Sequence, residues 1–168
     1  MPDVLLPLAG PTWARWVATV AGLGFLRPGP GTWGSIGTGV FLWILVQVTP
    51  PSWVAIMLMV IASTIGVFGW WSVHRLHHDP RTVLQDPPQV VVDEAFGVSL
   101  ALLVVPTVHT VACPTAVIMV AVLMFRVLDI AKPYPIDRLE TLPGATGVMA
   151  DDALAGLLAG LAVTMLWA

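Results

Sequence analysis

The sequence predicts an all-α membrane protein, a multi-helical bundle with a polar site on one side of the bilayer. Hydrophobic residues make up 57% of the 168-residue chain and charged residues only 10%, whereas soluble domains typically carry about 25% charged residues. Mean hydropathy is +0.88. Nearly all charges lie in a few stretches that separate uncharged apolar runs. We therefore expect residues 1–168 to form one membrane-embedded domain, with residues 1–11 as a short tail.

The charge and cysteine content exclude two other classes. A formal net charge of −3 is too small to indicate a nucleic-acid partner. The single cysteine, Cys113, cannot form an intrachain disulfide. Nothing in the sequence indicates an oligomeric state.

The N-terminal part predicts an interfacial helix followed by a loop. Residues 12–25 are moderately apolar and contain Trp13, Arg15 and Trp16, which suits a helix lying at the membrane surface. Residues 27–35 are rich in glycine and proline and predict a loop.

Apolar runs predict the membrane helices. Residues 36–48 and 53–73 are separated by a proline-containing turn, and tryptophans stand at both ends of the second run, as interfacial anchors do. The later runs, 95–105, 115–125 and 153–168, are short for spanning segments. We expect about four to five membrane helices.

Threading these helices brings the charged stretches to one side. Residues 27–35, 74–94 and 126–152 then share a side, while the opposite connections, 49–52 and 106–114, contain no Lys or Arg. The positive-inside rule places the charged side in the cytoplasm. A soluble all-helical core is disfavoured, because it would need charged helix faces that are missing.

Acidic residues stand in three places on this side: Asp93-Glu94, Asp129 and Asp151-Asp152. Carboxylates that converge at a membrane boundary repel one another and need a cation, and oxygen ligands suit Mg²⁺. Helix capping is the alternative, because a helix N-terminus favours acids. Capping suits Asp93-Glu94 and Asp151-Asp152, which precede apolar runs, but it suits Asp129 badly.

Basic and small residues accompany these acids. Arg126 and Asp129 are three residues apart and would share a helix face, while Lys132 precedes Pro133 and is biased out of a helix. Cations beside carboxylates suit a bound phosphate, although simple ion pairs explain them nearly as well. Gly156 and Gly160 follow Asp152 at helical spacing, as Gly97 follows Asp93, which predicts close helix packing beneath the acids.

The glycine-rich segment before residue 36 offers a second candidate for phosphate binding. Its backbone N–H groups precede a helix, with Thr32 and Ser35 as hydroxyl donors. It is not a Walker loop, and a plain glycine-rich turn is the commoner explanation.

Four segments together resemble the signature blocks of the phosphatidylglycerophosphatase A family, in the same order from about residue 22 to the C-terminus. They are PGTWGS at 30–35, VDEAFG at 92–97, FRVLDIAKPYPI at 125–136 and GVMADDALAG at 147–156. The resemblance implies a Mg²⁺-dependent lipid phosphatase of the bacterial inner membrane. Such an enzyme converts phosphatidylglycerophosphate to phosphatidylglycerol and phosphate in phospholipid biosynthesis, with its active site facing the cytoplasm.

The resemblance also implies roles for individual residues. The metal-associated acids are Asp93, Glu94, Asp129, Asp151 and Asp152. The catalytic group is Asp93, Glu94, Arg126, Asp129 and Lys132. The phosphate-binding group is Thr32, Gly34, Ser35, Arg126 and Lys132.

Two mechanisms and one rival function stay open. A metal-activated water could attack phosphorus, or a carboxylate such as Asp129 could form an aspartyl-phosphate; we favour water slightly. The rival is a small membrane transporter or channel with an acidic ion site. It is disfavoured because the acids gather at one surface rather than along a path across the bilayer.

Overall fold

The computed structural model describes residues 8–79, 87–105 and 114–167, whose regular elements are helices, with no strand among them. This confirms the predicted all-α class. Most of the predicted N-terminal tail, part of the polar stretch at 74–94 and most of the turn at 106–114 lie outside the described residues.

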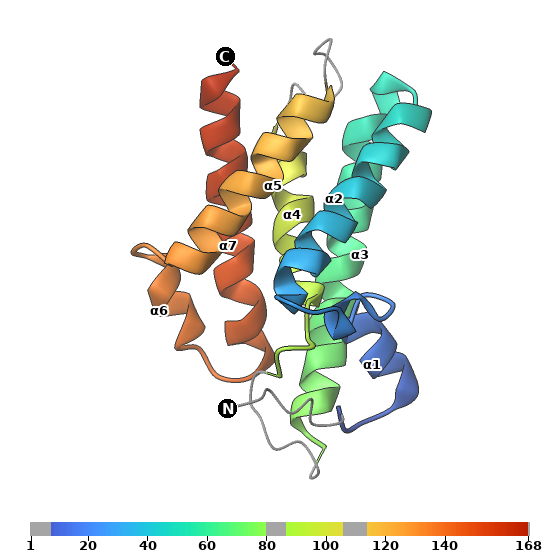
Figure 1. The fold of residues 1–168 in the computed structure, drawn as a ribbon, viewed down its shortest axis with the longest axis vertical. Coiled ribbons are helices and arrows are strands. Elements are labelled where there is room, and N and C mark those ends of the chain that lie inside the picture. The colour runs from blue at the N-terminus through green and yellow to red at the C-terminus, as the bar shows by residue number, and fades with distance from the viewer. Residues whose placement is uncertain (1–7, 80–86, 106–113, 168) are drawn as a thin grey trace.

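Long apolar helices make up most of the bundle (Figure 1). Within the described part of the chain, four helices are long and apolar enough to cross a membrane. They are α2 (Pro30–Val48), α3 (Pro51–His77), α5 (Pro114–Ala131) and α7 (Ala145–Leu166). With the shorter α4 (Val92–Val104), they agree with the predicted four to five helices.

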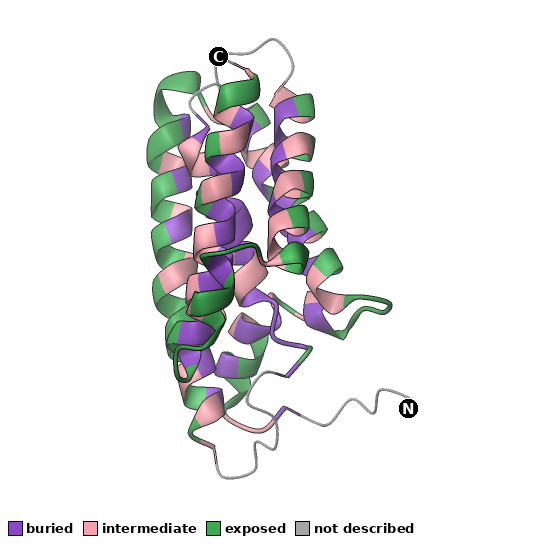
Figure 2. Cartoon of the chain, turned by 90° about the vertical axis from the view of Figure 1, so that its left-hand side faces the viewer, coloured by how far each residue is buried: buried purple, intermediate pink, exposed green. Residues whose placement is uncertain are grey.

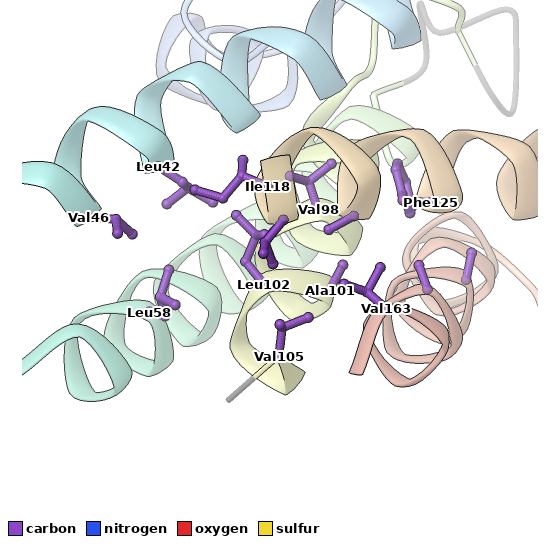
Figure 3. Close-up of a cluster of buried hydrophobic side chains, with 14 of the residues drawn as sticks. Leu42, Val46, Leu58, Val98, Ala101, Leu102, Val105, Ile118, Phe125 and Val163 are labelled. Atoms are coloured by element: carbon purple, nitrogen blue, oxygen red, sulfur yellow. The ribbon is translucent and has the colours of Figure 1, made fainter. Parts of the chain in front are cut away.

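Helix α4 is the centre of the bundle, in contact with α2, α3, α5 and α7. Its residues Val98, Ala101 and Leu102 are completely buried, and they pack against side chains such as Leu42 and Phe125 (Figure 3). A helix that is apolar on all sides is stable only when it is surrounded by others. The other helices therefore hold α4, and the acids of its first turn, in place.

The outer faces of the bundle are exposed (Figure 2) and carry many apolar side chains. Large hydrophobic side chains such as Phe41, Val60 and Leu123 are more than half exposed. A continuous apolar surface of this kind is unfavourable in water and suits a lipid environment.

The N-terminal helix is shorter than the predicted 12–25. It comprises α1 (Thr12–Ala18), followed by the 3₁₀ turn η1 (Leu23–Phe25). Trp16 on α1 is 59% exposed, and the rings of Trp13 and Trp71 are 5.0 Å apart. Helix α1 therefore packs on α3 near the end of the bundle where α2 begins (Figure 1).

Two predicted boundaries are wrong. The segment 27–35 is not a loop throughout, because α2 begins at Pro30, after Gly29 in a left-handed conformation (φ 68°); proline suits the first turn of a helix. Helix α7 begins at Ala145 rather than at Asp151. The two aspartates therefore lie well inside α7, where helix capping cannot explain them.

Helices α4 and α7 approach closely through glycines, as predicted. A Cβ atom on Gly156 would overlap the carbonyl of Gly97, and one on Gly160 would lie 2.5 Å from the carbonyl oxygen of Ala101. A Cβ on Gly97 would lie 2.7 Å from the carbonyl oxygen of Asp152. This contact brings the first turn of α4 beside Asp152.

Replacing Gly156 with alanine should destabilise the protein. In an unconstrained helix the same change is stabilising by roughly 1 kcal/mol. Here the new methyl group meets a backbone carbonyl that cannot rotate away, and overpacking costs about 1–3 kcal/mol. Thermal unfolding in detergent should show a lower Tm for Gly156→Ala and little change for Ala162→Ser, a small change elsewhere on α7. An unchanged Tm for Gly156→Ala would contradict the described helix contact.

Candidate active site

Three carboxylates from two helices converge at one end of the bundle. Asp93 and Glu94 belong to the first turn of α4, and Asp152 belongs to α7. One carboxylate oxygen from each lies within 4.8 Å of the others, and Asp152 is only 4% exposed. The set fits one hard cation such as Mg²⁺, because all three ligands are oxygens.

The α4 helix dipole accounts for only part of this arrangement. It favours Asp93 and Glu94 at the N-terminus of α4, and the backbone N–H of Glu94 donates to Asp93 Oδ1 at 3.1 Å. Asp152 has no such support inside α7. Buried carboxylates this close together repel one another unless a positive charge lies between or beside them.

Helix α5 contributes a positive charge and a further acid. Arg126 Nη1 donates to Asp129 Oδ2 at 2.6 Å and lies 3.7 Å from Glu94 Oε1. The Asp129 carboxylate is also close enough to Asp152 to interact with it electrostatically. The predicted shared face of Arg126 and Asp129 is confirmed, and it faces the acids of α4 and α7.

The first turn of α2 closes another side of the cluster. A Cβ atom on Gly31 would overlap Glu94 Oε1 and would lie 3.3 Å from Arg126 Nη1. Only glycine allows α2 to begin this close to the acids. Gly31 was not among the predicted site residues, although the glycine-rich segment that contains it was a signal.

The other residues of that segment are arranged differently. Ser35 is fully buried and its hydroxyl donates to the carbonyl of Gly31 at 2.8 Å. Gly34 is buried against Val91. Thr32 is exposed in the first turn of α2. The structure thus uses Gly34 and Ser35 to pack α2, and brings Gly31 rather than Gly34 to the acids.

Lys132 and Asp151 form a separate pair beside the cluster. Lys132 follows α5 in a left-handed conformation (φ 40°), and its Nζ lies 2.7 Å from Asp151 Oδ2 and 3.2 Å from Glu140 Oε1. Glu140 ends the short helix α6 (Ile136–Glu140). Burial lowers the pKa of Lys132, but the bonds and charges of Asp151 and Glu140 outweigh it and raise that pKa above its ordinary value.

Asp151 and Asp152 therefore have different neighbours. Adjacent residues on a helix point about 100° apart, so Asp152 faces the acids of α4 while Asp151 faces Lys132. Glu140 was missed at the sequence level, because no helical spacing relates it to Lys132.

Several buried polar atoms of this region have no hydrogen-bond partner among the described residues. They are Glu94 Oε2, Arg126 Nε and Asp151 Oδ1. Buried polar groups in folded proteins are nearly always paired. A cation would satisfy the oxygen of Glu94, and an anion such as phosphate would satisfy the nitrogen of Arg126. The donor set therefore fits a metal together with a phosphate.

Comparisons with known proteins find relatives that are named as phosphatases. A protein of Bacteroides thetaiotaomicron, provisionally named a phosphatidylinositol-3-phosphatase, is 33% identical over 144 residues, 84% of this chain and 85% of the relative. Phosphatidylglycerophosphatase A of Haemophilus influenzae is 32% identical over 146 residues (84% of this chain, 81% of the relative). The Escherichia coli protein of the same name is 29% identical over 130 residues (77% and 69%).

No solved structure is significantly similar to this chain. The family model described as phosphatidylglycerophosphatase A matches residues 16–167, which is nearly the whole chain. The convergent acids, their arginine and the apolar helices around them are thus those of a member of the phosphatidylglycerophosphatase A family, to which this chain belongs.

Proposed function

We propose that this protein is a Mg²⁺-dependent phosphoric monoester hydrolase that converts phosphatidylglycerophosphate to phosphatidylglycerol and phosphate. One observation carries the proposal: the carboxylates of Asp93, Glu94 and Asp152 converge within 4.8 Å, beside Arg126, at one end of an apolar helical bundle. Family membership supports the reaction class. The acidic donor set supports a hard cation.

Each group of the site then has a task. Asp93, Glu94 and Asp152 would hold Mg²⁺, which would supply charge neutralisation at the phosphate oxygens and lower the pKa of a water. Arg126 holds the phosphate through the side of its guanidinium group that has no protein partner, Nε. Asp129, oriented by Arg126 Nη1 at 2.6 Å, accepts a proton from the attacking water.

We assign Lys132 to binding the phosphate, and Asp151 to holding the Lys132 side chain in position. The short contact at 2.7 Å directs the ammonium group toward α7, next to Asp152 in sequence. An ammonium held there stabilises negative charge that develops on phosphate oxygens during hydrolysis. Asp151 is therefore a positioning residue for Lys132 rather than the direct metal ligand that the sequence had suggested.

The topology supports a site at the cytoplasmic surface of the bacterial inner membrane. The start of α2, the end of α3, the start of α4, the end of α5 and the start of α7 all lie at the same end of the bundle (Figure 1). The basic residues of the chain concentrate in these segments, as the positive-inside rule requires of the cytoplasmic side. A transporter or channel would instead need ionisable groups across the membrane, and the described acids gather at this one end.

Phosphate release tests the activity directly. Purified protein with Mg²⁺ should release inorganic phosphate from phosphatidylglycerophosphate, and EDTA should abolish that release until Mg²⁺ is restored. Phosphatidylinositol 3-phosphate, the substrate in the name of the Bacteroides relative, is the comparison substrate. No release from phosphatidylglycerophosphate at saturating Mg²⁺ would contradict the proposal, and faster release from the inositol lipid would reassign the head group.

The neighbouring aspartates of α7 should differ in their effect on metal dependence. Asp152→Asn removes a proposed metal ligand, so the Mg²⁺ concentration for half-maximal activity should rise at least about tenfold. Loss of a residue that only supports a metal ligand already weakens metal affinity by about this factor. Asp151→Asn should lower kcat and leave that concentration within about twofold, because its partner is Lys132. Metal titrations of both variants check this. Equal shifts in the two variants would contradict the separate roles.

Gly31→Ala should reduce activity without unfolding the protein. The added methyl group would overlap the Glu94 carboxylate and displace it from the site, so kcat/KM should fall at least about tenfold, or roughly 1.4 kcal/mol in transition-state stabilisation. Gly39→Ala is the matched control on α2, because its methyl group would instead meet Val122. Wild-type activity in Gly31→Ala would show that the close approach of α2 is unimportant.

A further inference from the structure

An apolar groove of about 670 Å³ opens between α1, α2, α3 and α4. Its lining includes Trp16, Leu23, Phe41, Thr64 and Phe68. The volume lies within the range of about 300–1,000 Å³ that is typical of ligand sites. Two of its walls, α2 and α3, are candidate membrane spans, so an occupant could enter sideways from the lipid.

The groove and the acidic site share two helices. On α4, Val92 and Ala95 line the groove and flank Asp93 and Glu94 in the sequence. On α2, Thr38 lines the groove seven residues after Gly31. Seven residues are almost two helical turns, so both positions lie on nearly the same face of α2, about 10 Å apart along its axis.

The Thr38 side chain is a polar group of the groove lining whose hydrogen-bonding capacity the described part of the protein leaves unused. It is 4% exposed, and its hydroxyl has no hydrogen-bond partner among the described residues. Other hydroxyls in these helices donate to the carbonyl four residues earlier, as Thr64 does to Val60 at 2.7 Å. Burial of an unpaired hydroxyl is costly, and a hydrogen-bond acceptor that reached Thr38 from the groove would relieve that cost.

We infer that this groove binds one acyl chain of the phospholipid substrate, with the Thr38 hydroxyl donating to the ester carbonyl at the head of that chain. The inference rests on the proposed function. It matches the chemistry of the substrate, in which two glycerol units and a phosphodiester separate the terminal phosphate from the esters. A phosphate near Arg126 and an ester near Thr38 would lie about 10 Å apart along α2. This length is comparable to the separation of the two groups in the substrate.

Filling the groove should impair binding of long chains only. Thr64 is exposed at the edge of the groove, so Thr64→Phe places a ring in it without disturbing the core. Phosphate release is measured from dioleoyl and dihexanoyl phosphatidylglycerophosphate. Thr64→Phe should raise KM for the dioleoyl lipid at least fivefold, with kcat and the dihexanoyl kinetics unchanged. Ser63→Phe, at a neighbouring exposed position outside the groove lining, is the matched control.

A second variant tests the hydrogen bond. Thr38→Val keeps the shape of the side chain and removes the hydroxyl. It should raise KM for both substrates about fivefold, the size of one hydrogen bond, because both contain the ester.

The outcomes separate the inference from the proposed function. Wild-type kinetics of Thr64→Phe on the dioleoyl lipid would overturn the acyl-chain site. An equal loss on both lipids in Thr64→Phe would also overturn it, since the damage would then not depend on chain length. Absence of phosphate release by the wild-type protein from either lipid would overturn the proposed function itself.

Discussion

The close contact between α4 and α7 is the constraint on which the rest of the site depends. Glycine on both helices lets their backbones meet, with a Cβ on Gly156 overlapping the Gly97 carbonyl. The same contact brings the carboxylates of Asp93 and Glu94 to Asp152. Like charges held this close in a largely buried place repel one another unless a positive charge lies between or beside them. Packing of the apolar bundle thus creates, at one end of it, an acidic group that could hold a metal ion.

The surrounding helices add further charged groups to this end of the bundle. Helix α5 brings Arg126 and Asp129 to the acids, and α2 begins against Glu94 because Gly31 has no side chain. Lys132 lies just beyond α5, paired with Asp151. Substrate chains can remain in the bilayer while the head group reaches this surface.

Much of this could be predicted from the sequence, because its signals are local. Apolar runs predicted the helices, and i, i+3 and i, i+4 spacing predicted the Arg126–Asp129 pair and the glycine contacts. Tertiary relations could not be predicted in the same way. The start of α7 at Ala145 was missed because the preceding charged stretch was assigned to a connection. The Lys132–Glu140 contact depends on how the turn after α5 folds, and nothing in residue spacing reports it.

We propose that the acids of α4 and α7 jointly hold a divalent cation. Titration with Mn²⁺, followed by electron paramagnetic resonance in the absence of substrate, measures this binding. The wild-type protein should bind Mn²⁺ saturably and in competition with Mg²⁺. Binding should be at least about tenfold weaker in Asp93→Asn and in Asp152→Asn, but not in the exposed Asp137→Asn. Binding that is unaffected by both cluster substitutions would show that these acids do not hold the cation.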